Sequence, residues 1–160
     1  MRRSDREVTD IAQIQAILDS CKTCHLAMVD GGRPYVVPLS YGYTLTDGVL
    51  TLYFHSAKEG RKIDVLRAQS AVCFEMTCEG EGTYVEEPAC NSGCYFASVI
   101  GFGDAVFVED AGEKCAALSQ LMRHQAHMEV TFTPAQAESV CVLKVTATEF
   151  TGKQKPKPGA

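Results

Sequence analysis

The sequence predicts a mainly β protein, a small antiparallel β-barrel of about six strands with flanking helices. Apolar runs of strand length follow one another with hairpin turns between them, and one of these turns contains Asp-Gly at 47–48. Only three segments have helical periodicity, and their irregular spacing does not fit repeated β-α-β units. The 160 residues are expected to form one domain, 1–160, which is long enough to bury a core.

The first predicted element is a helix at residues 9–20. Thr9 and Asp10 are its N-cap candidates, and apolar residues recur behind them at helical spacing: Ile11, Ile14, Ile17 and Leu18. A strand at 25–29 follows, and the segment Asp-Gly-Gly-Arg at 30–33 then predicts a hairpin turn.

The next strand, at residues 35–43, contains a proline. Pro38 has no N–H to donate to a strand ladder, so this strand is expected at a sheet edge, at a bulge or at an interruption. An interrupted ladder would leave neighbouring backbone groups free to bind something polar and flat. The alternative is an ordinary edge strand. The Asp-Gly turn then leads into a strand at 49–55.

The rest of the chain is predicted in the same way, in the order helix 60–68, strand 71–77, acidic loop 79–92, strand 95–108, helix 111–124 and strand 140–146. Gly101 and Gly103 predict a bulge or bend in the long strand, because a missing side chain permits one. The basic, proline-containing segment 152–160 is expected to be an irregular tail.

Charge and hydropathy exclude several classes of partner. The net charge of −5 argues against nucleic-acid binding. No apolar run approaches the roughly 20 residues that span a bilayer, so no membrane partner is expected. The charged N-terminus lacks the apolar stretch of a signal peptide. A cytoplasmic protein is therefore expected, and its eight cysteines are expected to be reduced thiols.

Metal-binding and haem-binding patterns are weak. Cys21-Lys-Thr-Cys24-His25 matches the attachment sequence of c-type haem, but Cys24 and His25 are expected to point to opposite faces of a strand. A zinc or iron–sulfur site could combine Cys21 and Cys24 with Cys90 and Cys94. His124 and His127 lie near a helix end, where surface histidines are common. No metal is expected, and no hydrolase pattern is present.

The segment from Tyr53 to Lys62 is the richest in chemistry. A strand ends at His55 and a helix follows. The exposed amides of the first helical turn could therefore form a cradle for an anion such as a phosphate monoester, together with His55, Ser56, Arg61 and Lys62. The alternative is that Ser56-Ala-Lys-Glu59 is a capping box and that the two cations lie on a solvated helix face.

The order of several motifs resembles the nitroimidazole-resistance (Nim) family, which belongs to the FMN-binding split barrels related to pyridoxamine 5′-phosphate oxidase. The resemblance covers nearly the whole chain. It is carried by the segments Pro34–Tyr43, Leu52–Lys62, Val72–Phe74, Ser98–Gly103 and Thr151–Lys153.

This resemblance implies a split barrel, a cofactor and a set of site residues. The flavin ring of FMN would lie against the backbone of Val37, Pro38, Leu39 and Ser40. Its phosphate would be held by His55, Ser56 and Lys62, with Arg61 nearby. Split barrels of this family are homodimers with cofactor sites at the subunit interface, so Ser98 and Val99 would approach the flavin of the partner chain.

The resemblance also implies a function. We expect an FMN-dependent oxidoreductase that reduces small flat substrates such as nitroaromatics and 5-nitroimidazoles, with no residue identified as catalytic. One alternative is a flavin-binding or electron-transfer protein without turnover of its own. Another is a haem-binding barrel with His25 or His55 as axial ligand, and a third is a thiol-based sensor.

Overall fold

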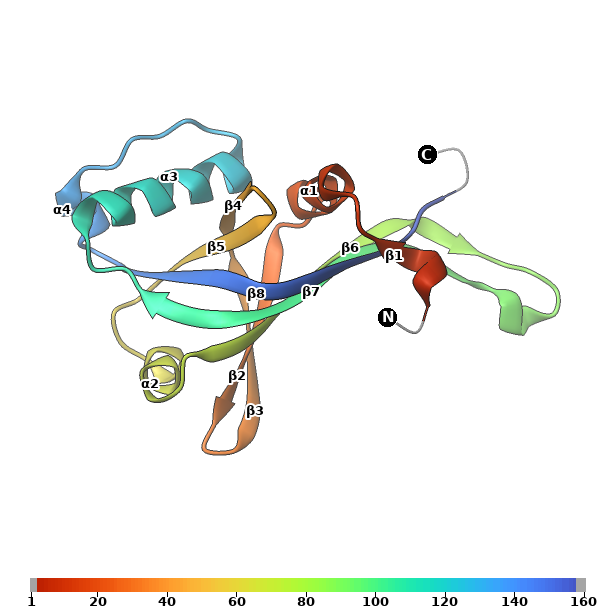
Figure 1. The fold of residues 1–160 in the computed structure, drawn as a ribbon, viewed down its shortest axis with the longest axis horizontal. Helices are drawn as coiled ribbons and strands as arrows, with labels where there is room; N and C mark the ends of the chain where they lie inside the picture. Colours follow the sequence, from red (N-terminus) through yellow and green to blue (C-terminus); the bar gives the residue numbers. More distant parts are fainter. Residues whose placement is uncertain (1–2, 158–160) are drawn as a thin grey trace.

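The computed structural model describes residues 3–157, apart from the side chains of residues 79–81. Its centre is one eight-stranded antiparallel sheet with the strand order β3-β2-β6-β7-β8-β5-β4, and β1 pairs with β8 (Figure 1). The chain passes directly from β3 to β4, which are the two ends of this path, so the sheet curls into a barrel. The prediction of a mainly β barrel with flanking helices is confirmed.

The elements have the following bounds. The strands are β1 (Glu7–Val8), β2 (Thr23–Asp30), β3 (Arg33–Ser40), β4 (Gly42–Thr46), β5 (Val49–Ser56), β6 (Ala71–Tyr84), β7 (Gly93–Phe107) and β8 (Cys141–Lys155). The α-helices are α1 (Ile11–Ser20), α2 (Arg61–Ala68), α3 (Ala111–Ala126) and α4 (Pro134–Ala137). Two short 3₁₀ turns lie at Ser4–Arg6 and Ala89–Asn91.

Local sequence signals placed several of these elements correctly. Asp10 is the N-cap of α1, because its carboxylate accepts a hydrogen bond from the Ala12 amide at 2.9 Å. The turn between β4 and β5 has positive φ at Asp47 and Gly48, as a two-residue hairpin turn requires. The predicted irregularity in β7 is a register shift against β8 between Phe102 and Gly103.

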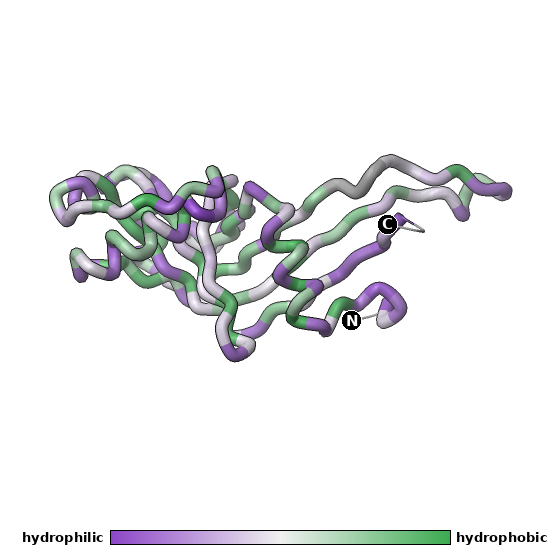
Figure 2. The backbone as a smooth tube through the Cα atoms, turned by 90° about the horizontal axis from the view of Figure 1, so that it is seen from above, coloured by the Kyte–Doolittle hydropathy of each residue, from purple (hydrophilic) through white to green (hydrophobic). Residues whose placement is uncertain are grey.

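Three predictions were wrong. The expected strand at 35–43 is two strands, β3 and β4, separated at Tyr41. The expected loop at 79–92 begins as strand, because β6 continues to Tyr84 and pairs with β7, and the two form an arm that projects from the barrel (Figures 1 and 2). Within this segment, only residues 85–92 lack strand structure. The expected tail from residue 152 is strand as far as Lys155, since it pairs with β7, and residues 158–160 lie outside the described residues.

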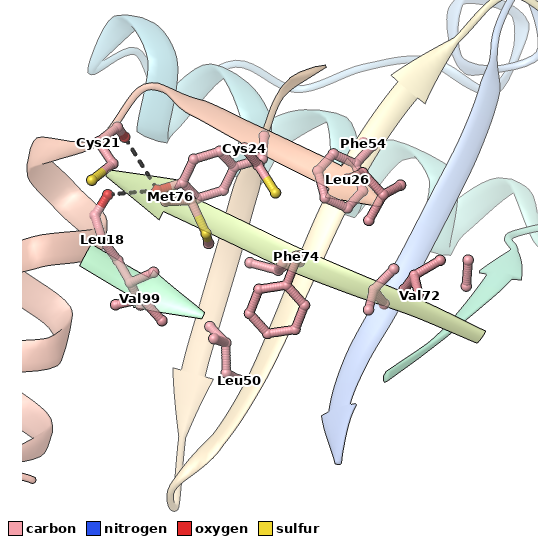
Figure 3. Packing of buried hydrophobic residues seen from close by; sticks show 14 of the residues in the cluster. Leu18, Cys21, Cys24, Leu26, Leu50, Phe54, Val72, Phe74, Met76 and Val99 are labelled. Atoms are coloured by element: carbon pink, nitrogen blue, oxygen red, sulfur yellow. Dashed lines mark hydrogen bonds between the residues drawn. The ribbon is translucent and has the colours of Figure 1, made fainter. Parts of the chain in front are cut away.

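The core lies inside the barrel, between α1 and the inner faces of the strands. Along the strands, hydrophobic residues recur between more hydrophilic ones, and the stretch that leads to the C-terminus is hydrophilic (Figure 2). The largest wholly buried side chains include Leu26, Phe54, Phe74 and Met76, which come from β2, β5 and β6 (Figure 3). Alternation along these strands leaves the opposite, outer face of β2, β6 and β7 without a covering layer within the described chain.

Tyr41 fixes the break between β3 and β4. Its ring is fully buried, and its hydroxyl donates to the carbonyl oxygens of Leu18 at 2.8 Å and Cys21 at 3.2 Å, at the end of α1. His124 of α3 packs against this ring with centroids 4.5 Å apart, and its Nε2 donates to the Cys21 carbonyl at 2.9 Å. Burial raises the pKa of Tyr41 and lowers the pKa of His124. The break between β3 and β4 is therefore held in place by contacts of Tyr41 with the end of α1 and with α3.

No helix within residues 3–157 has both the length and the apolar character needed to cross a membrane.

Candidate functional site

Strand β3 lies at an edge of the sheet. It pairs only with β2 in the sheet path, and Pro38 lies opposite His25. The edge position expected from Pro38 is therefore confirmed. Val37 and Leu39 turn inward and pack against the core, whereas Pro38 and Ser40 are exposed on the outer face. The far edge of this segment has no ladder partner among the described strands, which leaves backbone groups free to bind a ligand.

The end of β5 lies beside the start of β8 and leads into the start of α2. His55 is exposed and lies opposite Val142, and Ser56 is half-buried and lies opposite Cys141. Ser56 belongs to β5, and α2 begins only at Arg61, so the capping-box alternative for Ser56 is wrong.

The N-terminus of α2 has no side-chain cap. Gly60 is the N-cap residue with φ 128°, and its carbonyl accepts from the amides of Ile63 at 2.8 Å and Asp64 at 3.2 Å. The Arg61 and Lys62 amides make no hydrogen bond to any residue among 3–157. Two donors therefore remain available at the positive end of the helix dipole, close to the end of β5.

The two cations that follow Gly60 are in different situations. Arg61 is already paired: its Nη2 lies 2.7 Å from Asp30 Oδ2, and its guanidinium carbon lies 4.5 Å from the centre of the Tyr35 ring. Lys62 is half-buried, and its ammonium has no ion pair or hydrogen bond within the described chain. Burial lowers the pKa of Lys62. An anion beside Lys62 would offset the cost of burying its charge. Lys62 is therefore a better candidate than Arg61 for binding a phosphate.

Ser98 and Val99 separate in the structure. Ser98 lies on the outer face of β7 with Ile100 and Phe102. Val99 has no exposed surface, because it points into the core opposite Met76. Ser98 is therefore the member of the pair whose side chain faces outward, and an approach of Val99 to the flavin of a partner chain would have to use its backbone.

A small basic pocket near Cys141 was not expected from the sequence. It has a volume of about 150 Å³, and three cations line it, Lys58, Arg67 and Lys114. Lys114 is buried and its Nζ lies 3.0 Å from Glu138 Oε2, while Lys58 contacts the other oxygen of the same carboxylate. These cations come from different elements, so no local motif could have predicted the pocket.

The outer face also carries a histidine–carboxylate pair. His25 Nδ1 lies 3.0 Å from Glu75 Oε2, and Thr77 Oγ1 donates to the other oxygen of the same carboxylate. The sequence places His25 and Glu75 in predicted strands, but nothing local indicates that β2 and β6 are neighbours.

The proposed metal ligands do not come together. Cys21 and Cys24 are buried in the core, and burial raises the pKa of each thiol to about 12. Cys90 and Cys94 are exposed on the arm. No group of three or more histidine, cysteine or acidic residues in the described chain could hold a metal ion. Cys24 points inward and His25 outward, as expected.

The two histidines near the end of α3 also differ. His124 is buried rather than on the surface, as its packing against Tyr41 requires, and His127 is the left-handed C-cap residue of α3. Both line a separate pocket of about 500 Å³ between α1, β4 and the end of α3. None of the residues expected to hold FMN lines that pocket.

Comparisons with known proteins agree with the geometry. A family model described as pyridoxamine 5′-phosphate oxidase matches residues 10–154. Among solved structures, a Bacteroides thetaiotaomicron protein whose proposed role is 5-nitroimidazole antibiotic resistance is 32% identical, with a TM-score of 0.79 over 92% of this chain and 86% of that chain. A search of curated proteins found no match.

More distant structures share the fold. A flavocytochrome from Azotobacter vinelandii is 22% identical, with a TM-score of 0.79 over 99% of this chain and 73% of that chain. An FAD-binding protein from Mesorhizobium loti is also 22% identical, with a TM-score of 0.67 over 94% of this chain and 97% of that chain.

Proposed function

Because the chain belongs to the pyridoxamine 5′-phosphate oxidase family, we propose that it binds FMN and reduces small flat substrates such as 5-nitroimidazoles. The observation that carries the proposal is Lys62, half-buried and without an ion pair among residues 3–157, beside the uncapped start of α2 and near the end of β5. An anion is the group that this arrangement lacks. The proposed role of the Bacteroides relative supports the substrate class.

The residues present fit a flavin mononucleotide. Lys62 and the amides of Arg61 and Lys62 would hold the phosphate, with the Ser56 hydroxyl and the His55 ring beside them. The free edge of β3 would hold the flavin ring, with backbone groups of Val37 to Ser40 bonding its polar rim. Bound flavin supplies the two electrons of the reduction. The protein binds it, orients it and excludes water from the reacting face.

A homodimer is part of this proposal. The outer face of the sheet exposes Val36, Ile100, Phe102 and Val106, and exposed apolar groups of this kind are typical of protein interfaces. If a second copy covers this face, the outward-facing Ser98 of one chain is in position to approach the flavin of the other. Light scattering of the purified protein would give the mass of the particle and test the dimer directly.

A second candidate function is haem binding by the same barrel. Two observations favour it. The fold is shared with a flavocytochrome and with a protein from Mycobacterium smegmatis that binds FAD and haem. In addition, the exposed ring of His25 is held by the carboxylate of Glu75. A histidine held in this way is also a typical axial ligand.

The deciding experiment is an absorbance spectrum of freshly purified protein, taken before and after addition of FMN and removal of the unbound fraction. The two absorbance bands of oxidised flavin support the proposal, and a Soret band favours the haem alternative. Reoxidation of the reduced flavoprotein by a 5-nitroimidazole under anaerobic conditions then separates an enzyme from a flavin-binding protein without turnover. A protein that keeps no FMN would contradict the proposal.

A further inference from the structure

The outer face of the sheet places an oriented imidazole beside the strand proposed to carry the flavin ring. Pro38, His25, Glu75 and Ile100 are cross-strand neighbours in one row that runs over β3, β2, β6 and β7. All four residues face outward, since the core residues of these strands occupy the alternate positions. Side chains opposite each other in a row have Cβ atoms about 5 Å apart, so His25 is the direct neighbour of Pro38 on this face.

The hydrogen bonds fix which nitrogen of His25 is free. Nδ1 lies 3.0 Å from Glu75 Oε2 and donates to it, because a carboxylate only accepts. Thr77 Oγ1 donates to the other carboxylate oxygen and so limits the rotation of Glu75. Nε2 has no partner among residues 3–157, and half of the His25 side chain is exposed. The ring therefore presents Nε2 outward, with its orientation held by the Nδ1 contact to Glu75.

We propose that His25 is the proton donor of the reduction and that Glu75 and Thr77 are the residues that position it. This inference rests on the proposed function. No other histidine in the described chain is paired with a carboxylate. His55, the other histidine near the proposed flavin, makes no hydrogen bond or ion pair within that part of the chain, so nothing there orients its ring.

The chemistry balances with a single proton from the protein. Reduction of an aromatic nitro group to a nitroso group needs one hydride, supplied by reduced flavin, and one proton, supplied by Nε2 of protonated His25. One N–O bond breaks, and the two hydride electrons remain on nitrogen. The released oxygen leaves as water with the hydride hydrogen and the His25 proton. His25 is left neutral, with its remaining proton on Nδ1 and hydrogen-bonded to Glu75, and it regains its Nε2 proton from solvent.

The test compares His25→Gln and Glu75→Gln with the wild type and with His127→Asn, a control at a histidine in the other pocket where asparagine tolerates the left-handed backbone. Each protein is loaded with FMN, reduced anaerobically and mixed with a 5-nitroimidazole in a single-turnover experiment. We expect His25→Gln to bind FMN as the wild type does and to react about 10²- to 10⁴-fold more slowly. The control should match the wild type.

A second readout does not need the flavin. In flavin-free wild-type protein, nitrogen NMR should find neutral His25 with its proton on Nδ1, and Glu75→Gln should shift the tautomer towards Nε2. If His25→Gln with bound flavin reduces the 5-nitroimidazole at the wild-type rate, the inference about His25 is overturned and the proposed function stays intact. A wild-type Soret band that His25→Gln removes would make His25 a haem ligand and overturn it as well. A wild type that binds no flavin would overturn both proposals together.

Discussion

Replacement of Lys62 by alanine tests the proposed phosphate site most directly. Lys62 is a half-buried cation with no carboxylate partner in the described chain, so its removal breaks no ion pair recorded there. A hydrogen bond to a charged group contributes about 1.5–3 kcal/mol. The Kd for FMN should therefore rise about 10- to 150-fold. Lys58→Ala is the matched control, because Lys58 is exposed and already paired with Glu138 at 3.0 Å.

The assay is a titration of flavin-free protein with FMN and, separately, with riboflavin, followed by quenching of flavin fluorescence. Riboflavin lacks the phosphate, so Lys62→Ala should leave its affinity close to that of the wild type. The FMN affinity of Lys58→Ala should change by about twofold or less. Wild-type FMN affinity in Lys62→Ala, or an equal loss for both flavins, would refute the assignment of Lys62 to the phosphate.

Three further predictions concern the packing around the end of α1. Tyr41→Phe removes the hydroxyl that donates to the Leu18 carbonyl and should lower the free energy of unfolding by about 1–3 kcal/mol. In a thermal scan this corresponds to a fall of roughly 3–10 °C in Tm. Tyr43→Phe is the control, because it loses only an exposed hydrogen bond to Asp19 and should lower Tm less. Gly42→Ala places a Cβ 2.5 Å from the Leu121 amide nitrogen of α3, so urea unfolding should show a loss of about 1–3 kcal/mol or more, and a wild-type midpoint would contradict this packing. Burial lowers the pKa of His124 below its unfolded value of about 6.5, so the unfolded chain binds more protons and stability should fall as the pH drops from about 7.5 to about 5.5. A Tm series over that range should show a shallower slope for His124→Gln, and an unchanged slope would exclude His124 as the source.

Features that depend on nearby residues were predictable from the sequence. The Asp10 cap and the Asp-Gly turn each involve residues two or three positions apart, so the sequence contains the whole signal. The edge position of β3 was predictable for the same reason, because Pro38 lacks an N–H in any context. Lys62 was identified as a candidate from the sequence, although the nearby Ser56 was also given a capping role that the structure excludes.

Features that depend on distant pairings were not predictable. Tyr41 breaks a strand because its hydroxyl bonds to the end of α1, about 20 residues earlier in the chain. The segment from residue 79 to Tyr84 has the composition of a loop and becomes a strand because β7 pairs with it. His25 and Glu75 are 50 residues apart, and their contact exists only because β2 lies beside β6. The outer-face part of the candidate site therefore became visible only in the structure.

The position of β8 has a consequence for how the protein folds as it is synthesised. β8 pairs with β1, β5 and β7, so it joins the beginning, the middle and the later part of the chain. The ribosome makes β5 long before β8. The β4–β5 hairpin can join the rest of the sheet only through β8, which is complete once residues 141–155 have been added. Contacts so distant in sequence form slowly, so we expect the barrel to close only after β8 has left the ribosome, in milliseconds to seconds rather than microseconds.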